Sequence, residues 1–408
     1  MSRIALGVSA GIAAYKACSL LRLFTESGHD VEVVPTANSL EFVGAATWAA
    51  LSGRPVHTGV FEAPELVNHV RIGREADLVV VAPATADLIA RAASGRADDL
   101  LTNVLLTARC PVMLAPAMHT EMWQHPATRA NVATLRSRGV VVVPPAVGRL
   151  TGPDSGPGRL PEPDDLFATA LGLLAEPSRA AALAGQDLLG LTVVVSAGGT
   201  HEALDPVRFL GNASSGRMGV GIARAAVQRG AEVVLVGAHL AVPPPAGVRL
   251  VEVGSTAELA TAMAPLAQEA DIVVMAAAPA DFTPAHTSTT KLKKTGDQGL
   301  AVEFVQTTDV LAGLAAGRRR GQVVVGFAAE TAADRNDLVA LGVDKLRRKG
   351  CQLLVLNDVS GGAVFGASEN SVAILGLDGV RATASGEKTS VGHAILDAAL
   401  SVRKEESE

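Results

Sequence analysis

The chain contains 408 residues with a mass of 41.6 kDa, a length that favours two domains over one. Hydrophobic residues make up 48% and charged residues 19%, which is enough apolar material for large cores and excludes a disordered chain. The net charge is −6 and no basic stripe with interleaved aromatic residues occurs, so nucleic-acid binding has little support.

Membrane and secretion signals are also missing from the sequence pattern. Every hydrophobic run is of strand length or broken by charge, well short of the ~20 residues that span a bilayer. The first residues have the pattern of a strand and a glycine turn, so we expect a cytoplasmic protein that does not bind membranes. Three widely spaced cysteines (Cys18, Cys110 and Cys351) predict neither a disulfide framework nor a zinc site.

Lysine is rare, with eight residues against 27 arginines, yet five of the eight fall in one region. These five are Lys291, Lys293, Lys294, Lys345 and Lys349. Random clustering is one interpretation, and a binding site for an anionic ligand is the other.

Short runs rich in Val, Ile and Leu alternate with Ala-rich stretches of helical period. This pattern is typical of a parallel sheet that helices cover on both faces. In the first half, we predict strands at 4–8, 31–34, 78–82, 112–115 and 140–143. A Pro/Gly-rich stretch (148–163) and one helical stretch (165–184) follow.

The second half repeats the alternation, with predicted strands at 192–196, 232–236, 272–276, 323–327, 353–356 and near 371–375. We therefore predict an α/β protein with two doubly wound, Rossmann-like domains and mostly parallel sheets. The expected boundaries are 1–175 for the first domain, 176–190 for a connector and 191–408 for the second domain. The halves also echo each other, since residues 76–87 and 270–281 are identical at eight of twelve positions.

Ligands of open α/β sheets bind beyond the carboxyl ends of the strands. In the first half, Ser9-Ala10-Gly11-Ile12 follows the first strand and opens a helix, whose backbone N–H groups suit a phosphate. Thr36 and Thr85 end the next two strands and point to the same edge. The turn is neither a GxGxxG motif nor a P-loop, so a small-residue turn needed for packing alone is the alternative.

Several longer motifs define the first half more closely. They are Gly7-Val-Ser-Ala-Gly-Ile-Ala-Ala-Tyr-Lys16, Asn68-His69-Val70, and the stretches 82–87, 95–101, 115–118 and 122–123. In this order, over nearly all of residues 1–165, they resemble the phosphopantothenoylcysteine decarboxylase family of FMN flavoproteins. The resemblance implies a flavodoxin-like domain. Its FMN site would comprise Ser9, Gly11, Ile12, Thr36, Phe42, Pro83, Ala84 and Thr85.

The resemblance also implies a reaction. In the family, the flavin oxidises the substrate thiol to a thioaldehyde, which gives the carbanion left by CO₂ an electron sink. A histidine that matches His69 assists, and the reduced flavin then returns the enethiol to the thiol.

Two positions depart from the family pattern. His119 stands where the family has an Asn that holds the substrate carboxylate, and a histidine can keep this role as a hydrogen-bond donor. Gly152 stands where the family has the flap cysteine that supplies the last proton. We expect an intact decarboxylase in which Asp154, Ser155 or a water supplies this proton. The alternatives are altered or impaired decarboxylation and a non-catalytic flavin-binding subunit.

In the second half, Ser196-Ala-Gly-Gly-Thr200 ends a strand, and Asn212-Ala-Ser-Ser-Gly-Arg-Met-Gly219 opens a helix. Alone, these residues are compatible with the dinucleotide site of a two-domain NAD(P)-dependent oxidoreductase. The lack of a GxGxxG fingerprint and of an acidic residue after the strand at 232–236 argues against this interpretation.

Further motifs follow at 205–208, 276–281, 291–294, 307–309 and 325–331, at Lys345 with Lys349, and at 357–358. Together they resemble the phosphopantothenate–cysteine ligase family over residues 191 to about 375. A decarboxylase followed by a ligase is the arrangement of the bifunctional enzymes of coenzyme A biosynthesis. The resemblance implies that CTP activates 4'-phosphopantothenate as an acyl-cytidylate, which L-cysteine attacks with release of CMP. The first domain would then decarboxylate the product to 4'-phosphopantetheine.

The ligase resemblance also implies roles for single residues. Asn212 would act on the acyl-cytidylate, Lys291 on the triphosphate, and Arg208 would hold phosphopantothenate across a subunit interface. Binding of the nucleotide and the other substrates would involve Ala276, Ala277, Asp281, Thr307, Asp309, Phe327, Lys345 and Lys349. Mg²⁺ is expected with CTP, although the sequence shows no dedicated metal-ligand cluster. A homo-oligomer with contacts through both domains is expected as well. Without the resemblance, an exposed helix face would explain Lys345 and Lys349.

Overall fold

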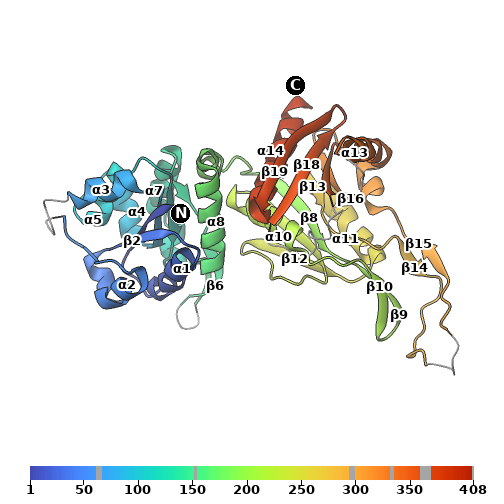
Figure 1. Ribbon diagram of the computed structural model, residues 1–408, viewed down its shortest axis with the longest axis horizontal. Helices are drawn as coiled ribbons and strands as arrows, with labels where there is room; N and C mark the ends of the chain where they lie inside the picture. Colours follow the sequence, from blue (N-terminus) through green and yellow to red (C-terminus); the bar gives the residue numbers. More distant parts are fainter. Residues whose placement is uncertain (61–66, 151–153, 294–298, 331–334, 359–368, 407–408) are drawn as a thin grey trace. The chain divides into compact units, whose positions relative to one another are not determined.

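The computed structural model describes residues 1–60, 67–150, 154–293, 299–330, 335–358 and 369–406 (Figure 1). The chain divides into two compact units, Met1–Asp187 and Leu188–Glu408, which we describe separately. Within the described ranges, no helix combines the length and the apolar character that crossing a bilayer requires.

The first unit is built on a five-stranded sheet. Its strands are β1 (Arg3–Val8), β2 (Asp30–Pro35), β3 (Leu78–Ala84), β4 (Val112–Pro116) and β5 (Val141–Val142). They lie in the order β2-β1-β3-β4-β5 and every neighbouring pair is parallel. This is the flavodoxin-like strand order, so the predicted α/β class is confirmed for this unit.

Helices cover both faces of this sheet. They are α1 (Ala14–Glu26), α2 (Ala45–Ser52), α3 (Asn68–Glu75), α4 (Ala86–Ser94), α5 (Leu100–Thr107), α6 (Thr120–Gln124), α7 (Pro126–Ser137) and α8 (Pro163–Ala175). Because strand side chains alternate between faces, Leu6 and Val80 join one buried cluster, while Val79 and Val81 join the other. Such double-sided burial explains why these strands are continuous apolar runs.

The helical stretch at 165–184, which we interpret from sequence as the last helix plus a connector, is interrupted in the structure. Helix α8 ends at Ala175, a 3₁₀ turn η3 spans Pro177–Arg179, and α9 (Ala180–Gly185) follows. Pro177 causes the break, because it has no N–H for the helical ladder and disfavours helical geometry at the residue before it. Leu183 of α9 packs into the core of the first unit, so this stretch belongs to that unit.

The Pro/Gly-rich stretch after the last strand contains an antiparallel hairpin, β6 (Ala146–Arg149) with β7 (Ser155–Arg159). We call this hairpin the flap. It is fixed to the loop that follows β4, because the Met118 N–H donates to the Gly158 carbonyl at 3.0 Å. A Cβ at Gly158 would lie 2.2 Å from the Met118 carbonyl oxygen, so the close approach requires glycine.

The second unit contains an eight-stranded sheet in the order β12-β11-β8-β13-β16-β17-β18-β19. The strands are β8 (Thr192–Gly198), β11 (Glu232–Ala238), β12 (Val248–Val253), β13 (Ile272–Met275), β16 (Val323–Glu330), β17 (Leu353–Asp358), β18 (Glu369–Gly376) and β19 (Gly379–Glu387). The first six strands run parallel, and β18 pairs antiparallel with both β17 and β19. The predicted doubly wound, mostly parallel sheet is confirmed, although β12 and β19 were missed.

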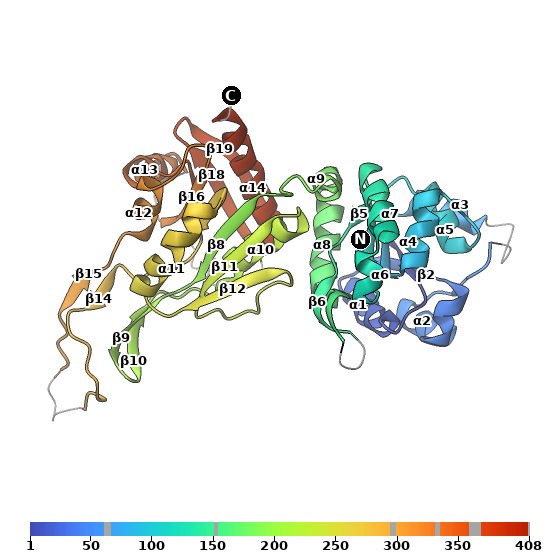
Figure 2. The same ribbon diagram turned by 180° about the vertical axis from the view of Figure 1, so that it is seen from behind.

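Two layers of helices cover this sheet (Figure 2). Helices α10 (Arg217–Gln228) and α14 (Lys388–Glu405) share a buried cluster on one face. Helices α11 (Thr256–Glu269), α12 (Val310–Ala316) and α13 (Arg335–Lys349) cover the other face. Where α10 meets α14, a Cβ at Gly221 would lie 2.9 Å from the Lys388 carbonyl, so the two helix starts are in close contact.

An arm extends from the second unit. It consists of the hairpin β9 (His201–Asp205) and β10 (Arg208–Gly211), with β14 (Phe282–Pro284), β15 (Phe304–Gln306) and the described residues between these two strands (Figure 1). The Ser288 N–H donates to the Leu204 carbonyl at 3.0 Å, which ties the two parts together.

Candidate functional site

The carboxyl edge of the first sheet brings the loops after β1 and β3 together through Ser9. The Ser9 hydroxyl donates to the Pro83 carbonyl at 2.8 Å and accepts from the Thr85 N–H at 2.9 Å. Its hydroxyl proton is therefore used to position the Pro83–Thr85 loop. A phosphate at this edge would instead meet the backbone N–H groups at the start of α1, where Gly11 lies beside Thr85.

Thr36 follows β2 at the same edge. Its N–H donates to the Val8 carbonyl at 2.9 Å, which places it next to the loop that contains Ser9. Its residue exposure is 7%, and its hydroxyl has no hydrogen-bond partner among the residues that the structure describes. A buried hydroxyl without a partner is costly unless a ligand supplies one, so Thr36 fits a phosphate-bearing cofactor.

Apolar side chains lie open to solvent around this edge. Ile12 is 71% exposed and Phe42 is 48% exposed, whereas Pro83 and Ala84 are buried at the end of β3. The predicted cofactor residues thus form two groups: those at the ends of the strands are buried, whereas Ile12 and Phe42 are exposed around them.

His69 lies on α3, and its position depends on α5. The Thr107 hydroxyl donates to the His69 carbonyl at 2.7 Å, and a Cβ at Gly73 would lie 2.2 Å from that hydroxyl. The His69 Nδ1 is buried and has no hydrogen-bond partner within the described ranges. In the described part of the chain, no hydrogen bond or ring contact links His69 to Ser9, Thr36 or Thr85.

His119 precedes α6 and faces the flap. Its Nδ1 lies 3.7 Å from a carboxylate oxygen of Asp154, the residue before β7. The preceding loop joins the site, because the Ala117 N–H donates to the Ala84 carbonyl at 3.2 Å. Gly152, which stands in the cysteine position, lies outside the described residues.

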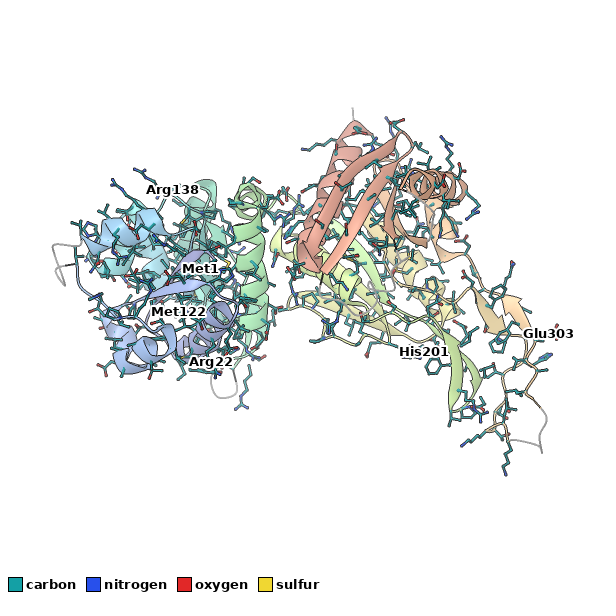
Figure 3. All side chains as sticks on the ribbon, in the orientation of Figure 1. Met1, Arg22, Met122, Arg138, His201 and Glu303 are labelled. Atoms are coloured by element: carbon teal, nitrogen blue, oxygen red, sulfur yellow. The ribbon has the colours of Figure 1, made fainter. Side chains whose placement is uncertain are left out.

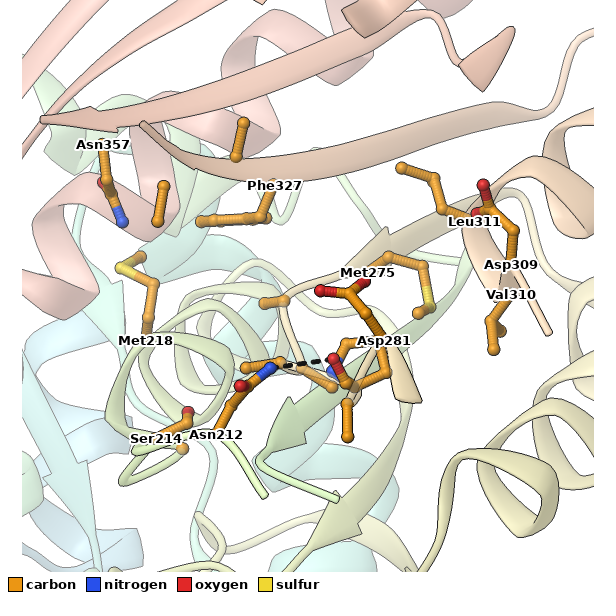
Figure 4. A pocket seen from close by; sticks show the side chains of 18 of the residues that line it. Asn212, Ser214, Met218, Met275, Asp281, Asp309, Val310, Leu311, Phe327 and Asn357 are labelled. Atoms are coloured by element: carbon orange, nitrogen blue, oxygen red, sulfur yellow. Dashed lines mark hydrogen bonds between the residues drawn. The ribbon is translucent and has the colours of Figure 1, made fainter. Parts of the chain in front are cut away.

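The second unit contains a cavity of about 740 Å³ at the carboxyl edge of its sheet (Figure 4). It lies at the reversal of strand order between β8 and β13, where ligands of doubly wound sheets bind. Nine predicted residues line it: Asn212, Ala276, Ala277, Asp281, Thr307, Asp309, Phe327, Lys345 and Lys349. The fold thus brings together residues that are up to 137 positions apart in the sequence (349 − 212).

Buried hydroxyls hold the cavity floor in place. The Ser196 hydroxyl accepts from the Ala277 N–H at 3.1 Å, and the Thr200 hydroxyl accepts from the Ala280 N–H at 2.9 Å. The Thr307 hydroxyl donates to the Ala280 carbonyl at 2.6 Å. These bonds join the loops after β8, β13 and β15.

Asn212 lines the cavity, and its side-chain amide donates to the Pro279 carbonyl at 2.9 Å. Figure 4 shows this bond, with Asp281 nearby in the middle of the cavity. The amide oxygen of Asn212 is left for a ligand or water, because only the nitrogen is used in this bond.

Asp309 and Lys349 form an ion pair at the cavity wall. Burial alone would raise the pKa of Asp309, but the Lys349 ammonium and the Ala312 N–H hold it below the ordinary value. The carboxylate also caps α12 by accepting from the Ala312 N–H at 3.1 Å.

The structure does not bring Arg208 and Lys291 to this cavity. Both lie on the arm, where the Arg208 guanidinium donates to the Asp205 carboxylate at 3.1 Å and to the Leu292 carbonyl at 3.2 Å. Asp205 also accepts from the Leu292 N–H. Burial alone would raise its pKa, but the N–H groups of Val207, Leu292 and Arg208 lower it. Lys294 lies outside the described residues.

A column of three rings fixes the base of the arm. His201, labelled in Figure 3, stacks on Phe209 at 3.6 Å and on His239 at 3.7 Å between ring centroids. Burial and the nearby His239 lower the pKa of His201. The sequence analysis gave no role to these histidines.

Arg217, Asn357, Asn370 and Lys388 line one end of the cavity. Arg217 and Asn357 lie in the quoted motifs without an assigned role, and sequence analysis missed Asn370 and Lys388. The rarity of lysine outside the cluster was a usable signal, since Lys388 is one of three remaining lysines. No group of three or more His, Cys, Asp or Glu side chains in the described ranges is arranged to hold a metal ion.

Comparison with known proteins gives matches to both units. The family described as "Flavoprotein" matches residues 1–175, and "DNA/pantothenate metabolism flavoprotein C-terminal domain" matches residues 188–402. The coenzyme A biosynthesis bifunctional protein CoaBC of Mycolicibacterium smegmatis is 54% identical over 402 residues, covering 97% of this chain and 96% of the relative. The protein of the same name from Bacillus subtilis is 40% identical over 380 residues, covering 92% and 91%.

A crystal structure of the C-terminal domain of a CoaBC protein is 31% identical, covers 53% of this chain and 98% of its own, and has a TM-score of 0.44. The full-length matches do not favour the NAD(P)-dependent oxidoreductase. The chain therefore belongs to the family of bifunctional coenzyme A biosynthesis enzymes, with a flavoprotein unit of the decarboxylase type followed by a ligase unit.

Proposed function

We propose that the second unit couples 4'-phosphopantothenate to L-cysteine with CTP through an acyl-cytidylate. The observation that carries this proposal is the cavity of about 740 Å³, which nine of the predicted ligase residues line. Its volume is in the range of nucleotide and cofactor sites, and its place at the strand-order reversal is where such ligands bind.

Amide formation from a carboxylate needs activation, and negative charge develops at the α-phosphate during that step. Positioned cations and amides stabilise such charge most effectively when they are fixed in advance. Asn212 is fixed in this way by its bond to Pro279, and its free amide oxygen suits orientation of the acyl-cytidylate. Lys345 and Lys349 line the wall and suit the nucleotide. Mg²⁺ would arrive with the triphosphate, which supplies most of its ligands.

We propose that two copies of the chain complete each ligase site. Arg208 and Lys291 lie on the arm and do not line the cavity of their own chain. A long arm that carries two cations is suited to reach the cavity of a second copy, where Lys291 would contact the triphosphate and Arg208 the phosphopantothenate. This arrangement supports a homo-oligomer with contacts through the ligase units.

For the first unit, we propose FMN-dependent decarboxylation of 4'-phosphopantothenoylcysteine. Thr36 and the backbone at Gly11 and Ile12 would hold the FMN phosphate, with Pro83–Thr85 and Phe42 beside the ring system. When bound, FMN supplies the reversible two-electron oxidation that allows the carboxylate to leave as CO₂. His119 would hold that carboxylate as a hydrogen-bond donor, and His69 would assist proton transfer.

The test supplies the purified protein with phosphopantothenate, L-cysteine and CTP. The expected result is release of pyrophosphate, followed by release of CO₂ that depends on FMN. Omission of CTP should stop both. Pyrophosphate release that does not depend on phosphopantothenate, or protein that neither contains nor takes up FMN, would contradict the proposal.

A further inference from the structure

Two cations lie together at one end of the ligase cavity. Lys388 and Arg217 both line it, and the positive charge of Arg217 is close enough to lower the pKa of Lys388. Lys388 has a residue exposure of 8%, whereas Arg217 is exposed. In the described part of the chain, neither side chain makes a hydrogen bond or an ion pair with an acidic residue.

This arrangement is unfavourable without a ligand. Burying an ammonium group costs free energy unless an opposite charge compensates, and a second cation nearby adds to that cost. Burial and Arg217 both lower the pKa of Lys388, which is the expected response of an uncompensated lysine. At the opposite wall, by contrast, Asp309 neutralises Lys349.

The backbone at this end also favours an anion. Helices α10 and α14 begin at Arg217 and Lys388, and the close contact at Gly221 holds the two helix starts side by side. Neither start has a side-chain cap that binds its first N–H groups. The positive ends of two helix dipoles therefore add to the charges of Lys388 and Arg217.

Neutral polar groups complete this end of the cavity. The Asn370 side-chain amide donates to the Asn357 amide oxygen at 3.1 Å, and it also lies 3.6 Å from the Met218 sulfur. Asn357 and Met218 are visible together in Figure 4, on the side away from Asp309. These contacts fix the wall around the two cations without bringing in a negative charge.

We propose that Lys388 and Arg217, with the starts of α10 and α14, form an anion-binding subsite for a phosphate group of a ligase substrate. This inference rests on the proposed ligase function of the same cavity. The phosphate belongs either to the triphosphate of CTP or to the phosphomonoester of phosphopantothenate. Lys388 acts by binding and positioning this group.

The first experiment measures the KM of each substrate for the wild type, Lys388→Met, Lys388→Arg and Lys404→Met. Methionine keeps the length of the buried side chain without its charge, and exposed Lys404 in the last turn of α14 is the matched control. Lys388→Met should raise one KM about 10- to 100-fold, the usual effect of losing a charge-assisted hydrogen bond. Lys388→Arg should restore most of the affinity, and Lys404→Met should match the wild type.

The identity of the affected substrate decides the source of the phosphate. A raised KM for CTP identifies the triphosphate, and a raised KM for phosphopantothenate identifies the phosphomonoester, while the KM for L-cysteine stays unchanged. If Lys388→Met leaves both KM values unchanged, or lowers kcat and thermal stability alone, the lysine is structural and the proposal is overturned.

A second measurement does not depend on turnover. Inorganic pyrophosphate should raise the melting temperature of the full-length wild type, and Lys388→Met should reduce this shift. If CTP supports no coupling but this shift depends on Lys388, the proposed function fails while the subsite stands. If Lys388→Met does not fold, the same KM and melting-temperature measurements are made with Arg217→Gln, which changes an exposed side chain. Equal shifts in wild type and variant would overturn the proposal.

Discussion

The two units share one architecture but build their sites in different ways. In both, the site lies at the carboxyl edge of a parallel sheet, and the loops at 82–87 and 276–281 follow equivalent strands. In the first unit, the chain passes from β1 to α1 through five residues (9–13). In the second unit, eighteen residues (199–216) separate β8 from α10, and they include the hairpin of the arm.

This difference in loop length determines what each unit can enclose. Beside the short connection of the first unit lie the buried hydroxyl of Thr36 and the exposed apolar side chains of Ile12 and Phe42. The long connection of the second unit walls a cavity of about 740 Å³. The first edge therefore leaves apolar side chains open to solvent, whereas the second places nine of the predicted ligase residues around one cavity.

The largest expected effect concerns the arm. Lys291→Gln should lower CTP-dependent coupling at least ~100-fold, because a fixed cation at the triphosphate is lost. If the arm serves a second copy, mixing Lys291→Gln with a cavity variant, Lys345→Gln, and allowing subunits to exchange should restore part of the activity. Each variant alone is the control. No recovery after demonstrated exchange would mean that the arm serves its own chain.

The flap provides a second test of the comparison, since it is where the first unit departs most from the decarboxylase pattern. We expect the thiol product, with Asp154, Ser155 or a water as the proton source in place of the missing cysteine. Mass spectrometry of the product from phosphopantothenoylcysteine checks this expectation. A product lighter by two hydrogens would favour the alternative in which decarboxylation ends at the oxidised compound.

Substitution of Thr36 tests whether the carboxyl edge of the first sheet binds a ligand. Thr36→Val removes a buried hydroxyl that has no partner among the described residues, so the melting temperature of the FMN-free protein should stay equal or rise. The Kd for FMN should rise about tenfold, the value of one hydrogen bond to a charged group. Flavin fluorescence during titration measures the Kd. Unchanged affinity would show that the hydroxyl does not contact the cofactor.

The smallest effect concerns pH and the base of the arm. Because the pKa of His201 is lower in the folded than in the unfolded protein, acidification through ~6.5 favours the unfolded state. The neutral ring stack therefore stabilises the folded protein above pH ~6.5, and this stabilisation is lost as the pH falls below that value. His201→Phe should flatten the dependence of the melting temperature on pH between ~7.5 and ~5.5. An unchanged slope would exclude His201 as its source.

Much of the fold could be predicted from the sequence, because buried parallel strands are continuous apolar runs that are easy to recognise. The edge strands β12 and β19 were missed, since their side chains are half-buried or exposed and do not form continuous apolar runs. The break at Pro177 was available from the sequence, because proline cannot continue a helical ladder.

The candidate sites were likewise predictable from sequence only in part. Motif residues at the ends of central strands, such as Asp281 and Phe327, come together in one cavity because topology brings parallel strand ends together. Lys388 could not be placed in the same way. Its position depends on the packing of α14 against α10, a contact between segments about 170 residues apart (388 − 217).

The central claim is that one chain carries two separate sites for consecutive reactions. The most direct test compares Lys291→Gln and His69→Asn in both half-reactions. We expect Lys291→Gln to decarboxylate supplied phosphopantothenoylcysteine at the wild-type rate while losing CTP-dependent pyrophosphate release. His69→Asn should lose decarboxylation while keeping CTP-dependent pyrophosphate release at the wild-type rate. Loss of both activities in either correctly folded variant would contradict the account.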